Sequence, residues 1–282
     1  MRVGIYTNLN KDQNGEHAKH VISLLTQKGA EVVFADNTDE NIFGIKKVKI
    51  QELSQYADVI MTFGGDGTVL KVVREQHNKS IPIVGVNCGK IGFLTEISKD
   101  ELEKAVDDLV NHRFEIVDRA VVSVEANNEE FSALNEVLLS SAITTEVGVF
   151  NVKIDGSSAV STKGDGIMLA TPTGSTAYSL ACNGPVIAPN VNAFIINSIC
   201  PYPVRTAPIV INDNCVVEIT SDSKNLKLVV DGKMMVDFPN GAKVVLKKTE
   251  DNVKFIKFEN DTDNFYQKIT KKLKLWSVSY ES

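Results

Sequence analysis

The chain has 282 residues, of which 43% are hydrophobic and 23% are charged, and its formal net charge is −6. The length predicts two domains, and the composition is that of a globular protein rather than a disordered one. The negative charge argues against nucleic acid as the main partner. No apolar run reaches the roughly 18 residues of a membrane span. The first residues look like a strand rather than a signal peptide, so no membrane or secretory role is expected.

The four cysteines are widely separated and form no Cys-x-x-Cys pair, so we expect no zinc site. Free thiols are typical of a reducing setting, which predicts a cytoplasmic protein. His17 and His20 share an expected helix, but no third ligand lies nearby in the sequence, and we assign no metal ligands.

Residues 1–113 alternate between strand and helix patterns. We expect strands at 2–7, 31–35, 57–63 and 81–86 and helices at 15–28, 68–76 and 102–109. Gly29 follows the first helix as a C-terminal cap, and Ser98–Glu101 matches a capping box before the last. This alternation predicts an α/β domain with a parallel, doubly wound sheet, whose ligands bind at the carboxyl ends of the strands.

The pattern changes after about residue 114. Residues 114–259 are strand-like pieces separated by turns, which predicts a mainly antiparallel β domain with helices around 175–182 and 190–199. Residues 260–282 regain helical character, and we expect them to pack either on the first domain or on a neighbouring copy. Within this tail, the basic segment 268–276 is interpreted as a solvated helix face.

Four Asp-Gly pairs occur, at 66–67, 155–156, 165–166 and 231–232. Asp155-Gly156 and Asp231-Gly232 join strand-like segments, so we interpret both as hairpin turns, which favour Asp-Gly because they need positive φ. Asp66-Gly67 instead lies between an expected strand and an expected helix. A hairpin turn does not explain it, nor does it explain three glycines within four residues.

Gly64, Gly65 and Gly67 have no Cβ, so backbone N–H groups there can approach an anion at the positive end of the following helix. Thr68 is expected to be the N-cap of that helix. Asp66 would repel a phosphate unless it held a metal or accepted a proton from an attacking hydroxyl, and phosphoryl transfer uses these roles. The spacing matches neither a Walker loop nor a dinucleotide fingerprint.

A second polar segment, residues 161–189, is rich in glycine and hydroxyl side chains. It offers donors for ribose and phosphate, and Tyr178 could stack on a base. The alternative is a Ser/Thr-rich loop that caps a helix. Asn135 and Glu136 are adjacent polar residues inside an expected strand, where they point to opposite faces, so at least one is expected to meet a ligand or a buried partner.

Four segments occur in the order and spacing of the NAD kinase family. They are GGDGT at 64–68, GVNCGKIGFLTE at 85–96, NE at 135–136 and KGDGIMLATPTGSTAY at 163–178. GGDGT is also similar to loops of lipid kinases and phosphofructokinases, whereas TPTGSTAY together with NE is more specific. The chain therefore resembles NAD kinases over most of residues 57–189.

The resemblance implies a phosphofructokinase-like α/β domain, a β-rich NAD-binding domain and a homodimer or homotetramer. The implied activity transfers the terminal phosphoryl group of ATP, or of polyphosphate, to the 2′-hydroxyl of the adenosine ribose of NAD. A divalent cation, Mg²⁺, is expected on the donor phosphates rather than in a protein cage.

Residue by residue, the resemblance implies that Asp66 is the catalytic acid-base group and that Gly64, Gly65, Gly67 and Thr68 form the phosphate loop. The residues implied to bind NAD are Asp66, Gly67, Asn135, Glu136, Lys163, Asp165, Thr173, Thr176, Ala177, Tyr178 and Lys233. Lys163 stands where the family often has arginine.

The chain departs from the family at 199–210, where Tyr202 and Ala207 replace a histidine and an arginine, so no contact is assigned there. Asn183 replaces one glycine of a common pair. Two alternatives remain: a lipid kinase with the same loop, or a non-catalytic NAD(P)-binding sensor. The hydroxyl-rich segment argues against the first, and the intact Asp66 argues against the second.

Overall fold

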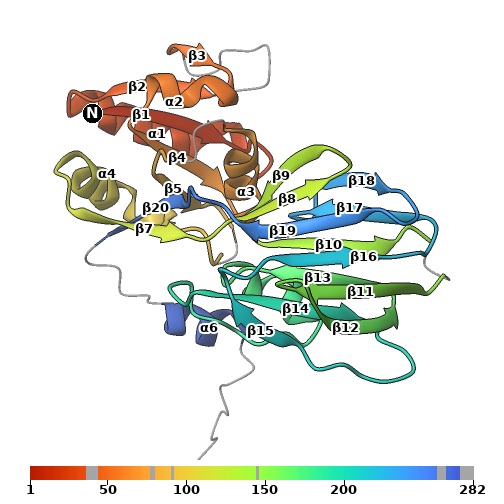
Figure 1. Cartoon of the computed structure of the whole chain (residues 1–282). Helices are drawn as coiled ribbons and strands as arrows, with labels where there is room; N and C mark the ends of the chain where they lie inside the picture. The colour runs from red at the N-terminus through yellow and green to blue at the C-terminus, as the bar shows by residue number, and fades with distance from the viewer. Residues whose placement is uncertain (36–43, 77–79, 90–91, 144–145, 259–264, 274–282) are drawn as a thin grey trace, which may run out of the picture. The chain divides into compact units, whose positions relative to one another are not determined.

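Figure 1 shows the computed structural model of the chain, which describes residues 1–35, 44–76, 80–89, 92–143, 146–258 and 265–273. The chain divides into two compact units, Met1–Asp118 with Val253–Ser282, and Arg119–Asn252. The sequence places residues 253–259 in the second domain, whereas in the structure Phe255 pairs with Ile83 in the sheet of the first unit.

The first unit contains a sheet with strand order β3-β2-β1-β4-β5-β20-β7, and β6 pairs with β5. Its strands are β1 (Arg2–Thr7), β2 (Glu31–Ala35), β3 (Lys47–Val48), β4 (Val59–Gly64), β5 (Ile83–Asn87), β6 (Ile97–Ser98), β7 (Phe114–Arg119) and β20 (Val253–Phe258). Its helices are α1 (Glu16–Gln27), α2 (Leu53–Tyr56), α3 (Asp66–Glu75), α4 (Leu102–Val110) and α6 (Phe265–Leu273), and short 3₁₀ turns lie at Gln13–Gly15, Ile50–Glu52 and Lys99–Glu101. The pairs of β1 with β2 and β4, and of β4 with β5, are parallel, which confirms the predicted parallel α/β fold.

Helices cover both faces of this sheet. Successive residues of a strand point to opposite faces, so neighbouring residues pack against different helices. Val3 and Met61 belong to a buried cluster with residues of α1 and α4. Gly4, between Val3 and Ile5, faces α2, and a Cβ there would lie 2.8 Å from Cδ1 of Leu53. The sheet is therefore a buried middle layer, as in other doubly wound folds.

The start of α1 is held by Asp12, which is fully buried. Its carboxylate accepts the backbone N–H groups of His17 and Ala18, at 3.0 and 3.1 Å, and the Thr7 hydroxyl at 3.0 Å. These N–H groups belong to the first helical turn, where no intrahelical acceptor exists. Gly29 follows the helix with φ +77°, which confirms the predicted end.

The chain adds strands on one side of β1 first and then on the other, so the order of the strands in the sheet reverses between β1 and β4. From β1 the sheet continues to β2 and β3 on one side and to β4 and β5 on the other. The backbone N–H of Asn8, directly after β1, donates to the carbonyl of Phe63 in β4 at 2.9 Å. The glycine-rich segment after β4 thus lies at the topological switch point, where open α/β sheets bind their ligands.

The second unit contains two six-stranded sheets, with strand orders β15-β14-β13-β10-β17-β18 and β12-β11-β16-β19-β8-β9. The strands are β8 (Val122–Ala126), β9 (Glu129–Ala133), β10 (Glu136–Ser141), β11 (Gly148–Ile154), β12 (Ser157–Gly164), β13 (Gly166–Ala170), β14 (Ala193–Ile199), β15 (Ile209–Asn212), β16 (Val217–Thr220), β17 (Leu226–Val230), β18 (Met234–Phe238) and β19 (Lys243–Lys248). One buried cluster combines residues of both sheets, such as Leu139 of β10 and Phe150 of β11. The antiparallel pairing of these sheets confirms the predicted β-rich domain.

Two sequence expectations for this unit differ from the structure. The helix predicted around 190–199 is wrong, because Ala193–Ile199 forms strand β14, buried along its whole length between β13 and β15. A fully buried strand is continuously apolar, so its periodicity does not distinguish it from a buried helix. The helix expected around 175–182 is present as a 3₁₀ turn, Gly174–Thr176, followed by α5, Tyr178–Ala181.

The expected strand that contains Asn135 and Glu136 is divided in the structure. β9 ends at Ala133 in one sheet and β10 begins at Glu136 in the other, so Leu134 and Asn135 lie where the chain crosses between sheets. A second crossing, from β12 to β13, passes through Asp165. Both crossings carry residues that the sequence assigned to ligand binding.

Candidate active site

Asp66 is the first residue of α3, and Gly65 alone separates it from the end of β4. The N-cap is Gly65, whose backbone is extended, so the prediction that Thr68 is the N-cap is wrong. Thr68 instead occupies the third helical position, and its hydroxyl accepts the Gly65 N–H at 3.5 Å and the side-chain amide of Asn8 at 3.4 Å. Gly64 is required by this arrangement, since a Cβ there would lie 2.2 Å from Oγ1 of Thr68.

The carboxylate of Asp66 is held by a loop that follows β5. Oδ2 accepts the backbone N–H of Phe93 at 2.9 Å, and Oδ1 accepts that of Leu94 at 3.0 Å. A Cβ on Gly92 would lie 2.0 Å from Oδ1 of Asp66, so this close approach needs glycine. Sequence reasoning missed the role of Gly92, because nothing in the local pattern connects it with a residue 26 positions earlier.

α6 contributes a cation beside Asp66. Nζ of Lys272 lies 3.4 Å from Oδ2 of Asp66 and 4.1 Å from the centroid of the Phe93 ring. The helix is anchored by an ion pair between Lys268 and Glu96 at 2.8 Å, in which both side chains are mostly buried. The interpretation of this basic segment as a solvated face is therefore wrong for Lys268, whereas Lys272 is exposed and also lies beside Asp66. Residues 274–276 of the segment lie outside the described residues.

In the second unit the carboxylate of Glu136 is buried, and the nearby backbone N–H of Tyr178 acts to lower its pKa. Within the described part of the chain, its Oε2 atom has no hydrogen-bond partner. Burial, followed by the nearby charge of Asp231, raises the pKa of Glu136 from 4.5 to about 7. A buried carboxyl group with an unused oxygen is typical of a position that meets a ligand hydroxyl.

Asp165 and Tyr178 line a common pocket of about 260 Å³ with Ile199 and Cys200. The Tyr178 side chain is 43% exposed, so its ring is accessible. Asp165 lies at the second sheet crossing, where its N–H donates to the Ile199 carbonyl at 2.9 Å. The structure therefore brings together two of the residues that the resemblance assigns to NAD binding.

The hydroxyl-rich segment has a structural role as well. The Thr171 hydroxyl donates to the Leu134 carbonyl at 2.6 Å, and the Ser175 hydroxyl donates to the Pro172 carbonyl at 2.6 Å. The Thr176 hydroxyl donates to the carbonyl of Thr173, a buried residue, at 3.3 Å. These bonds are internal to the loop, so the alternative of a Ser/Thr-rich loop that caps a helix accounts for part of this segment. Ala177 belongs to the same segment.

The remaining predicted residues lie apart from this pocket lining. Lys163 is exposed near the end of β12, and its carbonyl accepts the Tyr202 N–H at 2.8 Å. Lys233 is exposed after the β17–β18 turn, and its N–H donates to the Val230 carbonyl at 3.1 Å. Asn183 has φ +60°, a left-handed conformation that asparagine tolerates better than most residues, so it can replace a glycine there.

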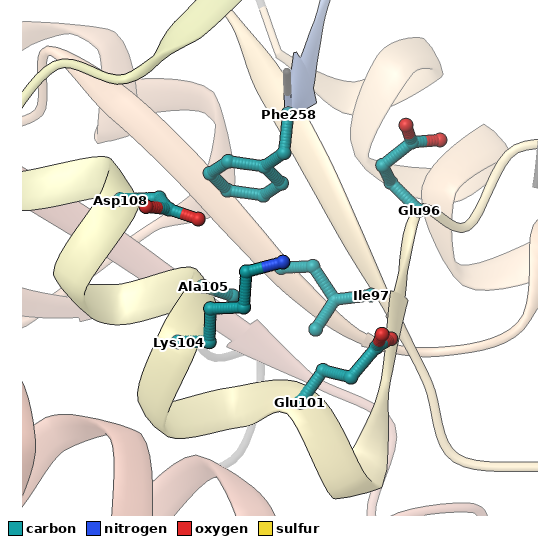
Figure 2. A pocket seen from close by; sticks show the side chains of 7 residues that line it. All are labelled: Glu96, Ile97, Glu101, Lys104, Ala105, Asp108 and Phe258. Carbon is teal, nitrogen blue, oxygen red and sulfur yellow. The ribbon is translucent and has the colours of Figure 1, made fainter. Parts of the chain in front are cut away.

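A smaller pocket lies in the first unit between α4, β6 and β20 (Figure 2). Its volume is about 30 Å³, and Lys104, Asp108 and Phe258 are among the side chains that line it. Ligand pockets typically have volumes of roughly 300–1,000 Å³, so a nucleotide does not fit in this one.

Among the residues that the structure describes, no three His, Cys, Asp or Glu side chains converge as a metal site. Asp66 offers one carboxylate, and both of its oxygens already accept backbone N–H groups. The donor set does not fit a resident metal ion, so we treat a divalent cation only as part of a phosphate substrate. Among the described helices, none combines the length and the apolar composition of a membrane span.

Residues 3–114 match the model of the ATP-NAD kinase N-terminal domain, and residues 134–258 match that of the ATP-NAD kinase C-terminal domain. The chain is 32% identical over 275 residues to an NAD kinase of Methanothermobacter thermautotrophicus, covering 97% of this chain and 96% of the relative. The chain belongs to the NAD kinase family. It is also 32% identical to an NAD kinase of Chlorobium luteolum, over 100% of this chain and 99% of that relative.

Solved structures of NAD and NADH kinases have the same fold. An NAD kinase from Archaeoglobus fulgidus in complex with ATP superposes with a TM-score of 0.80 and 27% identity, covering 95% of this chain and 98% of that chain. Yeast NADH kinase complexed with NADH gives a TM-score of 0.89 at 23% identity, over 100% and 90% of the two chains. At this identity the yeast enzyme shows the fold alone.

The raised pKa of Glu136 predicts how stability depends on pH. Between pH 4.5 and about 7 the native state holds a proton that the unfolded chain releases, so the free energy of unfolding falls as pH rises through this window. Glu136→Gln removes this loss and is expected to stabilise the protein at pH 8, relative to wild type, by up to about 3 kcal/mol. Urea unfolding at pH 5 and pH 8 measures the difference.

The matched control is Glu125→Gln, which removes an exposed carboxylate paired with Lys247 in the same unit. Exposed pairs contribute little, so this variant should differ from wild type by less than about 1 kcal/mol at both pH values. Equal effects of the two substitutions at pH 8 would contradict the assignment to a buried Glu136.

Proposed function

We propose that the protein is an NAD kinase that transfers the terminal phosphoryl group of ATP to the 2′-hydroxyl of the adenosine ribose of NAD, giving NADP. The observation that carries the proposal is the position of Asp66 at the N-terminus of α3 and at the switch point of the sheet. Membership of the NAD kinase family supports the same activity. The complex of the A. fulgidus NAD kinase with ATP supports ATP as the donor, and inorganic polyphosphate is the second donor to test.

Gly65 and Gly67 are proposed to make room for the phosphates of the nucleotides. A Cβ at either position would meet no described atom within 4 Å, so packing does not require glycine there. The Thr68 N–H donates to the Gly65 carbonyl at 2.8 Å, whereas the N–H groups of Asp66 and Gly67 precede the first intrahelical acceptor and lie at the positive end of the helix dipole. These features suit an anion, and Lys272 adds a nearby positive charge.

Asp66 is proposed to accept the proton of the 2′-hydroxyl as the phosphoryl group is transferred. The two N–H groups of Phe93 and Leu94 fix the direction of its carboxylate, and Gly92 permits their approach. A base fixed in this way loses little freedom when substrate binds, and positioning accounts for much of the rate of phosphoryl transfer. The divalent cation, Mg²⁺, arrives with ATP and neutralises charge on its phosphates.

Most contacts with NAD are assigned to the second unit, in addition to those of Asp66 and Gly67 in the first. Asn135 and Glu136 are proposed to bind ribose hydroxyls, because the unused Oε2 of Glu136 offers an acceptor. Tyr178 and Asp165 are proposed to contact the adenosine and nicotinamide ends from their common pocket. The other residues proposed to contact NAD are Lys163, Thr173, Thr176, Ala177 and Lys233. Assembly as a homodimer or homotetramer and a cytoplasmic location stay predictions.

One coupled assay separates this function from its alternatives. NADP formation from NAD is measured with Mg-ATP and then with Mg-polyphosphate, and a lipid acceptor such as diacylglycerol is offered in parallel. Formation of NADP supports the proposal. Turnover of the lipid alone would indicate a lipid kinase, and binding of NAD without turnover with either donor would indicate a sensor.

Asp66→Asn is expected to lower kcat for NADP formation by about 10²- to 10⁴-fold, because the amide cannot accept the proton of the hydroxyl. The dissociation constant for NAD should stay within about threefold, since Asp66 is assigned a single hydroxyl of NAD, the amide can still hydrogen-bond it, and the other assigned contacts remain. Asp155→Asn is the matched control, because it changes an Asp-Gly pair in a hairpin turn. Near wild-type kcat in Asp66→Asn would remove the acid-base role.

Gly92→Ala tests the positioning of Asp66 rather than its chemistry. The new Cβ would overlap the position of Oδ1, so the carboxylate must move, and kcat is expected to fall about 100-fold. Gly89→Ala is the control in the same loop, because a Cβ there meets no described atom within 4 Å. Equal kcat in the two variants would mean that the carboxylate position does not limit the reaction.

A further inference from the structure

Two Asp-Gly pairs of the second unit form the same kind of turn but use their carboxylates differently. Asp155 and Gly156 have φ +48° and +79°, and Asp231 and Gly232 have +47° and +63°. The exposed Asp155 accepts one N–H, from Val216 at 2.9 Å. Asp231 is only 6% exposed, so turn formation does not explain why a carboxylate is buried there.

The carboxylate of Asp231 accepts three consecutive backbone N–H groups. Oδ2 accepts that of Leu134 at 3.0 Å, and Oδ1 accepts those of Asn135 and Glu136 at 2.7 and 3.2 Å. These residues lie where the chain crosses from β9 to β10, so a regular strand ladder does not satisfy their N–H groups. A carboxylate accepting several N–H groups is also a strong, charge-assisted set of bonds.

The carbonyls of the same segment are bonded as well. The Leu134 carbonyl accepts the Thr171 hydroxyl at 2.6 Å, and the Asn135 carbonyl accepts the Thr171 N–H at 2.9 Å. The Glu136 carbonyl accepts the N–H of Asp231 itself at 3.0 Å. Every backbone polar group of residues 134–136 therefore has a partner, and four of these six bonds involve Asp231.

We propose that Asp231 is a positioning residue of the NAD site, which fixes residues 134–136 by their backbone and directs the carboxylate of Glu136 toward a ribose hydroxyl. This inference rests on the proposed function, because that function supplies the ligand. The unused, buried Oε2 of Glu136 is the atom that Asp231 holds ready. Asp231 acts through Glu136 and Asn135 and is not assigned a contact with NAD.

The negative charge of Asp231 also affects when Glu136 ionises. In the second unit, the titratable groups that interact with the Glu136 carboxylate are Asp231, from the β17–β18 turn, and the thiol of Cys182, after α5. The Tyr178 phenol interacts instead with Cys182, Cys200 and Asp165. An ionised Glu136 is the better acceptor for a hydroxyl, so affinity for NAD should rise with pH as Glu136 loses its proton.

The test uses Asp231→Asn in the full chain. Asparagine adopts the left-handed turn conformation, but its NH₂ group faces one N–H donor and its charge is absent. We expect KM for NAD to rise about tenfold at pH 7.5, while kcat and KM for ATP change less than about threefold. Asp155→Asn, the same substitution in the other turn, should leave all three values at the wild-type level.

The pH profile separates positioning from general loss of structure. In wild type, kcat/KM for NAD should rise through a midpoint near 7, and in Asp231→Asn this midpoint should shift to lower pH, because the charge of Asp231 is absent while the burial of Glu136 remains. Glu136→Gln should remove the rise. If Asp231→Asn does not fold, the pH profiles of wild type and Glu136→Gln are compared instead. Equal profiles would mean that ionisation of Glu136 does not affect the affinity for NAD, and this would overturn the proposal that Asp231 holds Glu136 ready for NAD.

Two outcomes distinguish this inference from the proposed function. If wild type forms NADP but Asp231→Asn has the wild-type KM for NAD and the wild-type pH profile, Asp231 is not a positioning residue. If wild type forms no NADP but binds NAD, calorimetric titration still measures the affinity of each variant. Tenfold weaker binding by Asp231→Asn alone would then support the inference while the proposed reaction fails.

Discussion

In each unit an aspartate of an Asp-Gly pair accepts consecutive backbone N–H groups from a segment far away in the sequence. Asp66 holds the loop at Phe93 and Leu94, and Asp231 holds the sheet crossing that begins at Leu134. Segments that leave a helix or a sheet have N–H groups without regular partners, and a carboxylate can accept several of them. The positions of the residues assigned to chemistry and to NAD binding depend on these bonds.

The two aspartates differ in what their charge does. Asp66 lies at a helix N-terminus with Lys272 nearby, a setting that favours an anionic group and phosphates beside it. Asp231 is buried next to a second carboxyl group, Glu136, whose pKa is raised first by burial and then by the charge of Asp231. The charge of Asp66 is available for reaction. The carboxylate of Asp231 instead orients Glu136, and its charge contributes to a pKa of Glu136 near neutrality.

Local patterns predicted the parts of the structure that depend on local physics. The β/α alternation, the end of α1 at Gly29 and the two hairpin turns followed from periodicity and φ requirements. The strand Ala193–Ile199 did not, because a buried strand and a buried helix are both continuously apolar. The roles of Gly92, Asp231 and Lys272 arise from contacts between residues 26 to 206 positions apart, which no local pattern encodes.

The most direct test of this account is the position of the phosphate in the product. The full chain is incubated with NAD and Mg-ATP, and the product is analysed by ³¹P NMR and compared with the 2′- and 3′-phosphates of NAD. The account predicts a single product that carries the new phosphate on the 2′-hydroxyl of the adenosine ribose. A phosphate on any other hydroxyl, or bound NAD without transfer, would contradict it.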